Sequence, residues 1–214
     1  MDLRNLFRQR REIPHVSLQE IRDSFNAAAS DEDHFPSTID PRIFHVRLIA
    51  QFLGDMNGQT IADIGCGKGR FARVLKDQNP GGHFIAFDLA EAMLRFVPKD
   101  LRTCCGSMTA LPFRDAACDA AYATESLEHA VKIEEAVCEL CRIVKPGGRI
   151  VIIDKNAEKW GKLKTPAWER WFRREELEAM LRRHCSHVSS EYISYWEDVP
   201  PDGLFLAWKA IRKG

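Results

Sequence analysis

The stretch Ile61-Ala-Asp-Ile-Gly-Cys-Gly-Lys-Gly-Arg70 decides the fold of this chain, because it is a short apolar run that ends in three alternate glycines. A second apolar run, residues 83–87, ends in Asp88. Glycines let the backbone approach a ligand, and an acid at the end of the next strand accepts hydrogen bonds from a ribose. The pattern therefore predicts a strand, a tight turn, a helix and a second strand that together bind a nucleoside.

The spacing of the glycines separates this turn from two other nucleotide-binding turns. A dinucleotide site has the pattern G-x-G-x-x-G, and this chain has Arg70 at the sixth position, which disfavours NAD or a flavin. A phosphate-binding loop needs Ser or Thr after Gly-Lys, where this chain has Gly69. A tight turn that binds nothing is the structural alternative. Asp63 and Asp88 favour ligand binding.

These motifs and several that follow resemble the class I S-adenosylmethionine-dependent methyltransferases, in their small-molecule, ubiquinone-biosynthesis-like branch (methyltransferase type 11). The resemblance covers about residues 60–155 and, more loosely, residues 170–212. No single motif carries it. It rests on the order and spacing of four further segments, residues 88–94, 106–113, 118–129 and 144–153.

Strands and helices alternate along most of the chain, which predicts an α/β fold with a parallel sheet covered on both faces. The resemblance implies a Rossmann-like, doubly wound, mostly parallel sheet of seven strands that ends in an antiparallel hairpin. We expect residues 1–58 to form an N-terminal helical cap over the cofactor and residues 59–214 to form the binding core. Asp40-Pro41 predicts the start of the second cap helix, because a carboxylate cap precedes a proline.

Composition limits the classes of partner and compartment. The 214 residues fit one structural domain, and 31 basic residues balance 31 acidic ones, so net charge gives no reason to expect a nucleic-acid partner. Seven cysteines without metal-ligand spacing predict a reducing compartment and no metal site. We find neither a secretory signal nor an apolar segment long enough to cross a bilayer, so we expect a cytoplasmic protein.

The resemblance implies S-adenosyl-L-methionine as cofactor and S-adenosyl-L-homocysteine as product. Gly65 and Gly67 would leave room for the methionine part, Asp88 would bind the ribose diol, and Leu89 and Met108 would enclose the adenine. The full set of expected cofactor-binding residues is Asp63, Gly65, Cys66, Gly67, Gly69, Asp88, Leu89, Ser107, Met108 and Thr124.

Two of these residues have further interpretations. Asp88 can also serve as a plain helix cap, because an acid at a helix start satisfies backbone donors. Ser107 stands where the family usually has Asp or Glu, which typically binds the adenine amino group. A serine oxygen accepts one such bond without charge assistance.

A general base is required only where the methyl acceptor must lose a proton early. His129 is the first candidate, because imidazole titrates near neutrality, and Glu125 is the second. A histidine at a helix start that bonds to backbone is the structural alternative. Lys155 follows the fifth strand and is expected to be solvated rather than to bind an acidic substrate. Trp171 and Phe172 are expected to anchor the last helix to the sheet.

The sequence therefore predicts an enzyme that transfers a methyl group to an oxygen, nitrogen or carbon atom of a small-molecule metabolite. Residues 123–126 lack the Asn/Asp-Pro-Pro-Tyr turn used for exocyclic amines of DNA. The glycine spacing disfavours a hydride-transfer enzyme. A non-catalytic S-adenosylmethionine-binding partner subunit and a protein or RNA methyltransferase remain as alternatives.

Overall fold

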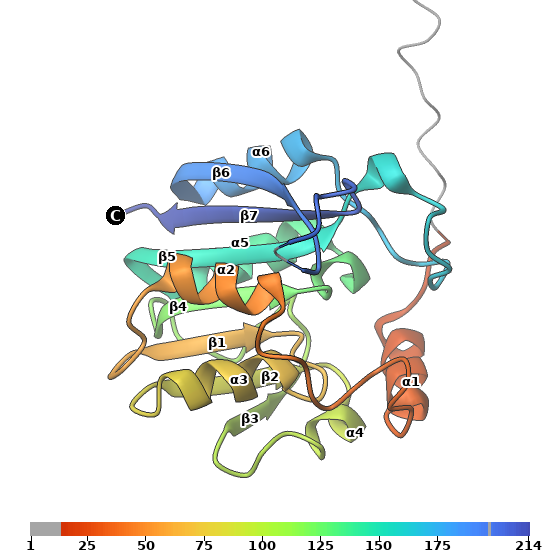
Figure 1. Cartoon of the computed structure of the whole chain (residues 1–214), viewed down its shortest axis with the longest axis horizontal. Coiled ribbons are helices and arrows are strands. Elements are labelled where there is room, and N and C mark those ends of the chain that lie inside the picture. The colour runs from red at the N-terminus through yellow and green to blue at the C-terminus, as the bar shows by residue number, and fades with distance from the viewer. Residues whose placement is uncertain (1–13, 197) are drawn as a thin grey trace, which may run out of the picture.

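The computed structural model describes residues 14–196 and 198–214. Its centre is a seven-stranded sheet with the order β3-β2-β1-β4-β5-β7-β6 (Figure 1). The strands from β1 to β5 are parallel, and β7 runs antiparallel to both β5 and β6. The predicted mixed sheet with a terminal antiparallel hairpin is thus confirmed. The strands are β1 (Thr60–Ile64), β2 (His83–Asp88), β3 (Arg102–Cys105), β4 (Cys118–Thr124), β5 (Val144–Lys155), β6 (Cys185–Ile193) and β7 (Phe205–Arg212).

Helices cover both faces of the sheet (Figure 1). One face carries α2 (Phe44–Leu53) and α3 (Arg70–Gln78), and the other carries α5 (Ile133–Ile143) and α6 (Arg174–His184). The first helix, α1 (Leu18–Ala28), lies beyond the carboxyl ends of the parallel strands, next to the short α4 (Glu91–Leu94). This end of the sheet is where ligands bind in open α/β folds.

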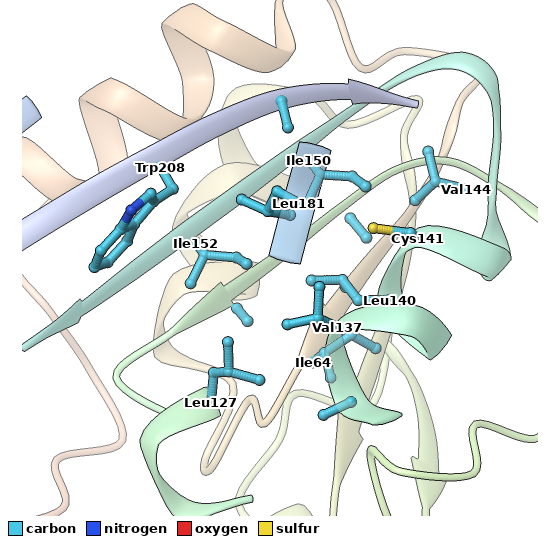
Figure 2. Close-up of a cluster of buried hydrophobic side chains, with 14 of the residues drawn as sticks. Ile64, Leu127, Val137, Leu140, Cys141, Val144, Ile150, Ile152, Leu181 and Trp208 are labelled. Atoms are coloured by element: carbon cyan, nitrogen blue, oxygen red, sulfur yellow. The ribbon is translucent and has the colours of Figure 1, made fainter. Parts of the chain in front are cut away.

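The apolar run of β5 explains why helices cover the sheet on both of its faces. Ile150 and Ile152 pack into the cluster shared with α5 and α6, which Figure 2 shows, whereas Val151 and Ile153 pack with α2 and α3. Side chains of a strand alternate between faces, so an uninterrupted apolar run requires apolar cover on both. On the helix side, Val137, Leu140 and Cys141 supply the matching buried face of α5 (Figure 2).

The two N-terminal helices have different places. α1 begins with a capping box: the Ser17 hydroxyl accepts from the backbone of Glu20, whose carboxylate accepts from the Ser17 backbone. The second helix begins at Phe44, so its predicted start at Asp40-Pro41 is wrong. The Asp40 carboxylate accepts hydrogen bonds from the backbone and guanidinium of Arg42 instead, and this local turn delays the helix. α2 then packs against the sheet, and the expected division of the chain after residue 58 stays a prediction.

His45 on α2 is buried without a hydrogen bond. Neither ring nitrogen has a partner within residues 14–196 and 198–214, and the ring lies among Phe71, Tyr195 and Phe205. Burial lowers the pKa of His45 from 6.5 to about 4. The folded state therefore binds fewer protons than the unfolded chain between these pH values, and stability present above pH 6.5 is lost as the pH falls toward 4.

We expect His45→Leu to be as stable as the wild type at pH 7 and more stable by about 2 kcal/mol at pH 5. Urea unfolding at both pH values measures this difference. Other titrating groups, such as Asp63, are common to both proteins and cancel in the comparison. Exposed His83, replaced by Gln, is the control and should leave stability unchanged at both pH values. An equal wild-type and His45→Leu stability at pH 5 would contradict the assignment of a neutral buried imidazole.

Candidate functional site

A cavity of about 290 Å³ opens at the carboxyl ends of β1, β2 and β4. Its walls come from the turn after β1, the end of β2, the loop after β3, the turn after β4 and the inner face of α1. Of the ten expected cofactor-binding residues, all but Gly69 line it, and both base candidates, His129 and Glu125, line it too. Gly69 instead caps α3 in a left-handed conformation next to Val97.

The glycine turn is tight for a physical reason at Gly65. Its φ is +76°, and a Cβ placed there would lie 2.3 Å from Cβ of Ser126. The Ser126 hydroxyl donates to the Ile64 carbonyl at 2.8 Å, so the turn after β4 is bonded to the end of β1. The backbone amides of Gly65 and Cys66 both donate to the Phe87 carbonyl, at 2.8 and 3.0 Å. Only glycine therefore fits at position 65.

Asp88 does two things at the end of β2. One carboxylate oxygen accepts from the Gly67 amide at 2.7 Å, and the other accepts from the Ala90 amide at 2.8 Å. Burial raises its pKa. A carboxylate has about four acceptor positions, so two remain for a ligand. The cap interpretation and the ribose interpretation are therefore compatible, because Asp88 fixes the glycine turn and can still accept hydrogen bonds.

Three buried polar atoms in the described wall of the cavity lack a partner, and one of them is Oε2 of Glu128. Oδ2 of Asp63 and Oγ1 of Thr124 make no hydrogen bond to any part of the chain that the structure describes. Burial raises the pKa of Asp63 to about 7. Unsatisfied buried acceptors are costly, so both atoms indicate a ligand that donates hydrogen bonds here.

The residue at the adenine position is already engaged. The Ser107 hydroxyl lies 2.7 Å from the Thr109 hydroxyl and also accepts from the Thr109 amide at 3.2 Å. Met108, between them, lines the cavity with its apolar side chain. The loop thus offers an apolar surface and a hydroxyl whose bonding capacity is partly used.

Glu125 is held by two partners. Its Oε1 accepts from the Tyr195 hydroxyl at 2.9 Å and from the Arg70 guanidinium at 3.3 Å. Burial acts to raise its pKa, but the charges of Arg70 and Lys155 and the Tyr195 hydrogen bond together with other neighbours outweigh this and keep the pKa of Glu125 below its usual value. Its φ of +50° is unusual for a residue with a side chain and places this carboxylate at the cavity.

His129 ends a short 3₁₀ turn, Leu127–His129, after β4. Its Nδ1 lies 3.3 Å from Nε1 of Trp168, and the ring of Phe25 from α1 meets it edge to face at 4.9 Å. Burial lowers the pKa of His129 to about 3. The imidazole is therefore neutral at physiological pH. The role of His129 or Glu125 as general base stays a prediction.

Lys155 is not solvated, so that expectation is wrong. The side chain is 8% exposed, and its ammonium group bonds to Oε1 of Glu128 and lies 3.7 Å from Glu169. Burial and neighbouring Asp154 raise the pKa of Glu128 well above its usual value. The same burial raises the pKa of Asp154 to about 6. Three carboxyl groups and one ammonium thus form a buried cluster, and three of its members, Glu128, Lys155 and Glu169, line the wall of the cavity.

The sequence contains a pattern that predicts burial of Lys155, but it contains none that predicts the position of Glu169. The apolar run of β5 predicts a strand covered on both faces, so the residues that end it are still inside the fold. Glu169 lies in a segment without periodicity, and only the fold brings its carboxylate to Lys155. Trp171 and Phe172 are buried as expected.

Three ligand-type side chains meet at this cluster. Glu128, His129 and Glu169 each place one donor atom within 4.8 Å of the others. The Lys155 ammonium already supplies the positive charge at this position. The expected absence of a metal site stays a prediction.

The segment between α1 and α2 is bound to the glycine turn by an ion pair and a hydrogen bond from Lys68. The Lys68 side chain is 1% exposed, and its ammonium group donates to the Glu32 carboxylate at 2.6 Å and to the Asp31 carbonyl at 3.2 Å. Phe35 of this segment packs edge to face on Phe25, and both line the cavity. Sequence patterns gave no hint of this contact, which closes the cavity on the side away from the sheet.

A glycine turn, an acidic strand end and a cavity between them define an α/β protein that binds a nucleoside. Residues 62–152 match the family model described as a methyltransferase domain. Residues 62–152 therefore form a class I S-adenosylmethionine-dependent methyltransferase domain, as the motifs predicted.

Curated relatives and solved structures agree with this placement. A demethylmenaquinone methyltransferase of Renibacterium salmoninarum is 29% identical over 160 residues, which cover 71% of this chain and 66% of that protein. A malonyl-[acyl-carrier protein] O-methyltransferase of Methylococcus capsulatus is 31% identical over 94 residues, 41% of this chain and 34% of that protein. These matches span less than two thirds of either relative.

Among solved structures, the [4+2]-cyclase SpnF superposes with a TM-score of 0.74 at 17% identity and covers 95% of this chain and 99% of that one. A methyltransferase in complex with the Trm112 activator of Haloferax volcanii gives a TM-score of 0.71 at 20% identity, covering 89% and 98%. At these identities the likeness concerns the fold. In the described residues, no helix is both long and apolar enough to cross a membrane.

Proposed function

We propose that this protein transfers a methyl group from S-adenosyl-L-methionine to a small-molecule acceptor. The observation that carries the proposal is the cavity in which the glycine turn, Asp88 and the Met108 loop converge under α1. When bound, this cofactor supplies an activated methyl group, so the protein contributes alignment and exclusion of water.

The unpartnered wall atoms fit the polar end of this cofactor. Asp63 and Thr124 would accept from its ammonium group, beside the room left by Gly65 and Gly67. Asp88 would accept from the ribose hydroxyls, while Leu89 and Met108 would enclose the adenine. Cys66 contributes the backbone of the turn, and Ser107 offers the adenine one uncharged oxygen.

The acceptor side of the cavity is formed mainly by apolar groups of the cap. Leu18, Ile21 and Phe25 of α1 face it, together with Phe35. This enclosed, apolar surface favours a small molecule over a nucleic acid, and the balanced charge of the chain agrees. A cytoplasmic location fits the free cysteines.

One observation supports a second candidate function, a non-catalytic S-adenosylmethionine-binding subunit. Ser107 replaces the acid that usually binds adenine, and its hydroxyl is already bonded to Thr109. The glycine turn and Asp88 support binding of the cofactor, but binding alone does not require turnover. Release of S-adenosylhomocysteine in the presence of a panel of metabolites separates the two functions.

Replacing Asp88 by Asn tests the proposed cofactor site. The change removes the negative charge and replaces one accepting oxygen by an amide nitrogen that donates. We therefore expect S-adenosylhomocysteine to bind about 10- to 100-fold more weakly by calorimetry. Asp119→Asn is the matched control, because that carboxylate accepts from Thr60 and Lys145 at the opposite end of the sheet. Heat with NAD but with neither sulfur nucleoside would overturn the proposed function.

A further inference from the structure

Trp168 determines which nitrogen of His129 carries the proton. An indole N–H only donates, and Nε1 of Trp168 lies 3.3 Å from Nδ1 of His129. Nδ1 must therefore be the accepting, unprotonated nitrogen. The neutral ring then carries its hydrogen on Nε2, and His129 becomes a hydrogen-bond donor toward the cavity that it lines.

The group beside Nε2 is a carboxylate oxygen with one free side. Oε2 of Glu169 accepts from the Trp171 indole at 2.8 Å and lies 3.7 Å from the Lys155 ammonium. Oε1 of Glu169 lies 3.7 Å from Nε2 of His129, which is too long for a hydrogen bond. Oε1 of Glu128, also 3.7 Å from Nε2, is already taken by Lys155. Of the two carboxylate oxygens that lie 3.7 Å from Nε2 of His129, Oε1 of Glu169 is therefore the one that no other group occupies.

A donor and an acceptor that stand side by side but do not bond to each other match a group that does both. A hydroxyl accepts from one and donates to the other, whereas a carbonyl oxygen only accepts and an ammonium only donates. Phe25, whose ring packs on His129, places an apolar surface next to this pair. The arrangement thus favours an alcohol or a phenol.

We propose that Nε2 of His129 and Oε1 of Glu169 bind the hydroxyl group of the methyl acceptor, with Trp168 as the positioning residue that sets the His129 tautomer. This rests on the proposed function. In the transfer, the hydroxyl oxygen forms a bond to the methyl carbon as the carbon–sulfur bond breaks and its electron pair stays on sulfur. The hydroxyl proton passes to Oε1 of Glu169.

The tautomer can be tested without knowing the acceptor. Long-range ¹H–¹⁵N spectra of the histidine-labelled protein bound to S-adenosylhomocysteine should show His129 protonated on Nε2 and unchanged between pH 5 and 8. Trp168→Phe keeps an aromatic ring but removes the donor, so the Nδ1–H form should appear. Trp196→Phe, at an exposed tryptophan, is the control. An Nδ1–H form in the wild type, or no change in Trp168→Phe, overturns the proposal.

The hydroxyl preference has its own test in the same complex. Phenol should shift the His129 Nε2–H resonance at millimolar concentration, whereas anisole, which cannot donate, and benzylammonium, which cannot accept, should not. Glu169→Gln should weaken the phenol response at least 10-fold and leave S-adenosylhomocysteine affinity within 2-fold of wild type. An equal response to anisole or benzylammonium overturns the hydroxyl assignment. Failure of S-adenosylhomocysteine to bind the wild type would instead count against the proposed function.

Discussion

Gly65→Ala is expected to abolish detectable S-adenosylhomocysteine binding and to lower the free energy of unfolding by about 2–4 kcal/mol. The added methyl group would lie 2.3 Å from Cβ and 2.6 Å from Oγ of Ser126. Relief requires the turn after β4 to move away from β1, which breaks the bond from Ser126 to the Ile64 carbonyl. Calorimetric titration and urea unfolding measure the two effects.

Gly58→Ala separates the collision from backbone strain. Gly58 has a φ of +72°, close to the +76° of Gly65, and a Cβ there meets open space. The variant should lose about 1 kcal/mol from the left-handed backbone alone and bind S-adenosylhomocysteine like the wild type. If both variants lose equal stability and both still bind, the close approach of Gly65 to Ser126 is not what shapes the cavity.

The part of the fold predicted from sequence is the part set by local pattern. β1, β2 and β5 appear as apolar runs, and each ends where glycines, a polar residue or a turn interrupts the pattern. The helix before β5 has the same kind of local signal, because its apolar side chains recur at helical spacing. The position of the cavity follows from these elements, because parallel strands bring their carboxyl ends to the same edge of the sheet.

Contacts between distant segments could not be predicted in this way. A turn forms near Asp40, although the sequence pattern there predicts a helix start, because Arg42 donates hydrogen bonds back to the Asp40 carboxylate. Trp168 and Glu169 lie about 40 residues after His129 in a segment without periodicity, yet both flank its ring. Such contacts depend on the path of a loop, and a loop path has no repeating signal in the sequence.

The fold alone does not determine the reaction. A [4+2]-cyclase shares the architecture over nearly the whole chain. Function must therefore be argued from the site, where Asp63, Asp88, Thr124, His129 and Glu169 line one cavity. The proposed cofactor contacts and the proposed acceptor contacts use different residues, so cofactor binding and acceptor binding are tested with separate variants.

Lys155→Met is expected to lower the free energy of unfolding at pH 8 by about 3–5 kcal/mol, because removing one partner of a buried ion pair leaves uncompensated charge. Glu128, Asp154 and Glu169 would then lie together without a cation. The pKa values of Glu128 and Asp154, which burial already raises, should rise further, so the folded variant binds protons more readily than the unfolded chain. Stability gained by protonation increases as the pH falls, and the deficit should shrink between pH 8 and pH 5. Urea unfolding at both pH values measures it.

Two further variants decide whether the buried charge is the cause. Lys145→Met removes a lysine that pairs with Asp119 at the surface and is 49% exposed, so it should cost less than about 1 kcal/mol. The double variant Lys155→Met/Glu128→Gln removes one of the stranded carboxylates and should recover at least half of the loss at pH 8. A Lys155→Met deficit that is independent of pH and unaffected by Glu128→Gln would mean that lost packing of the lysine stem, rather than charge, holds the floor of the cavity together.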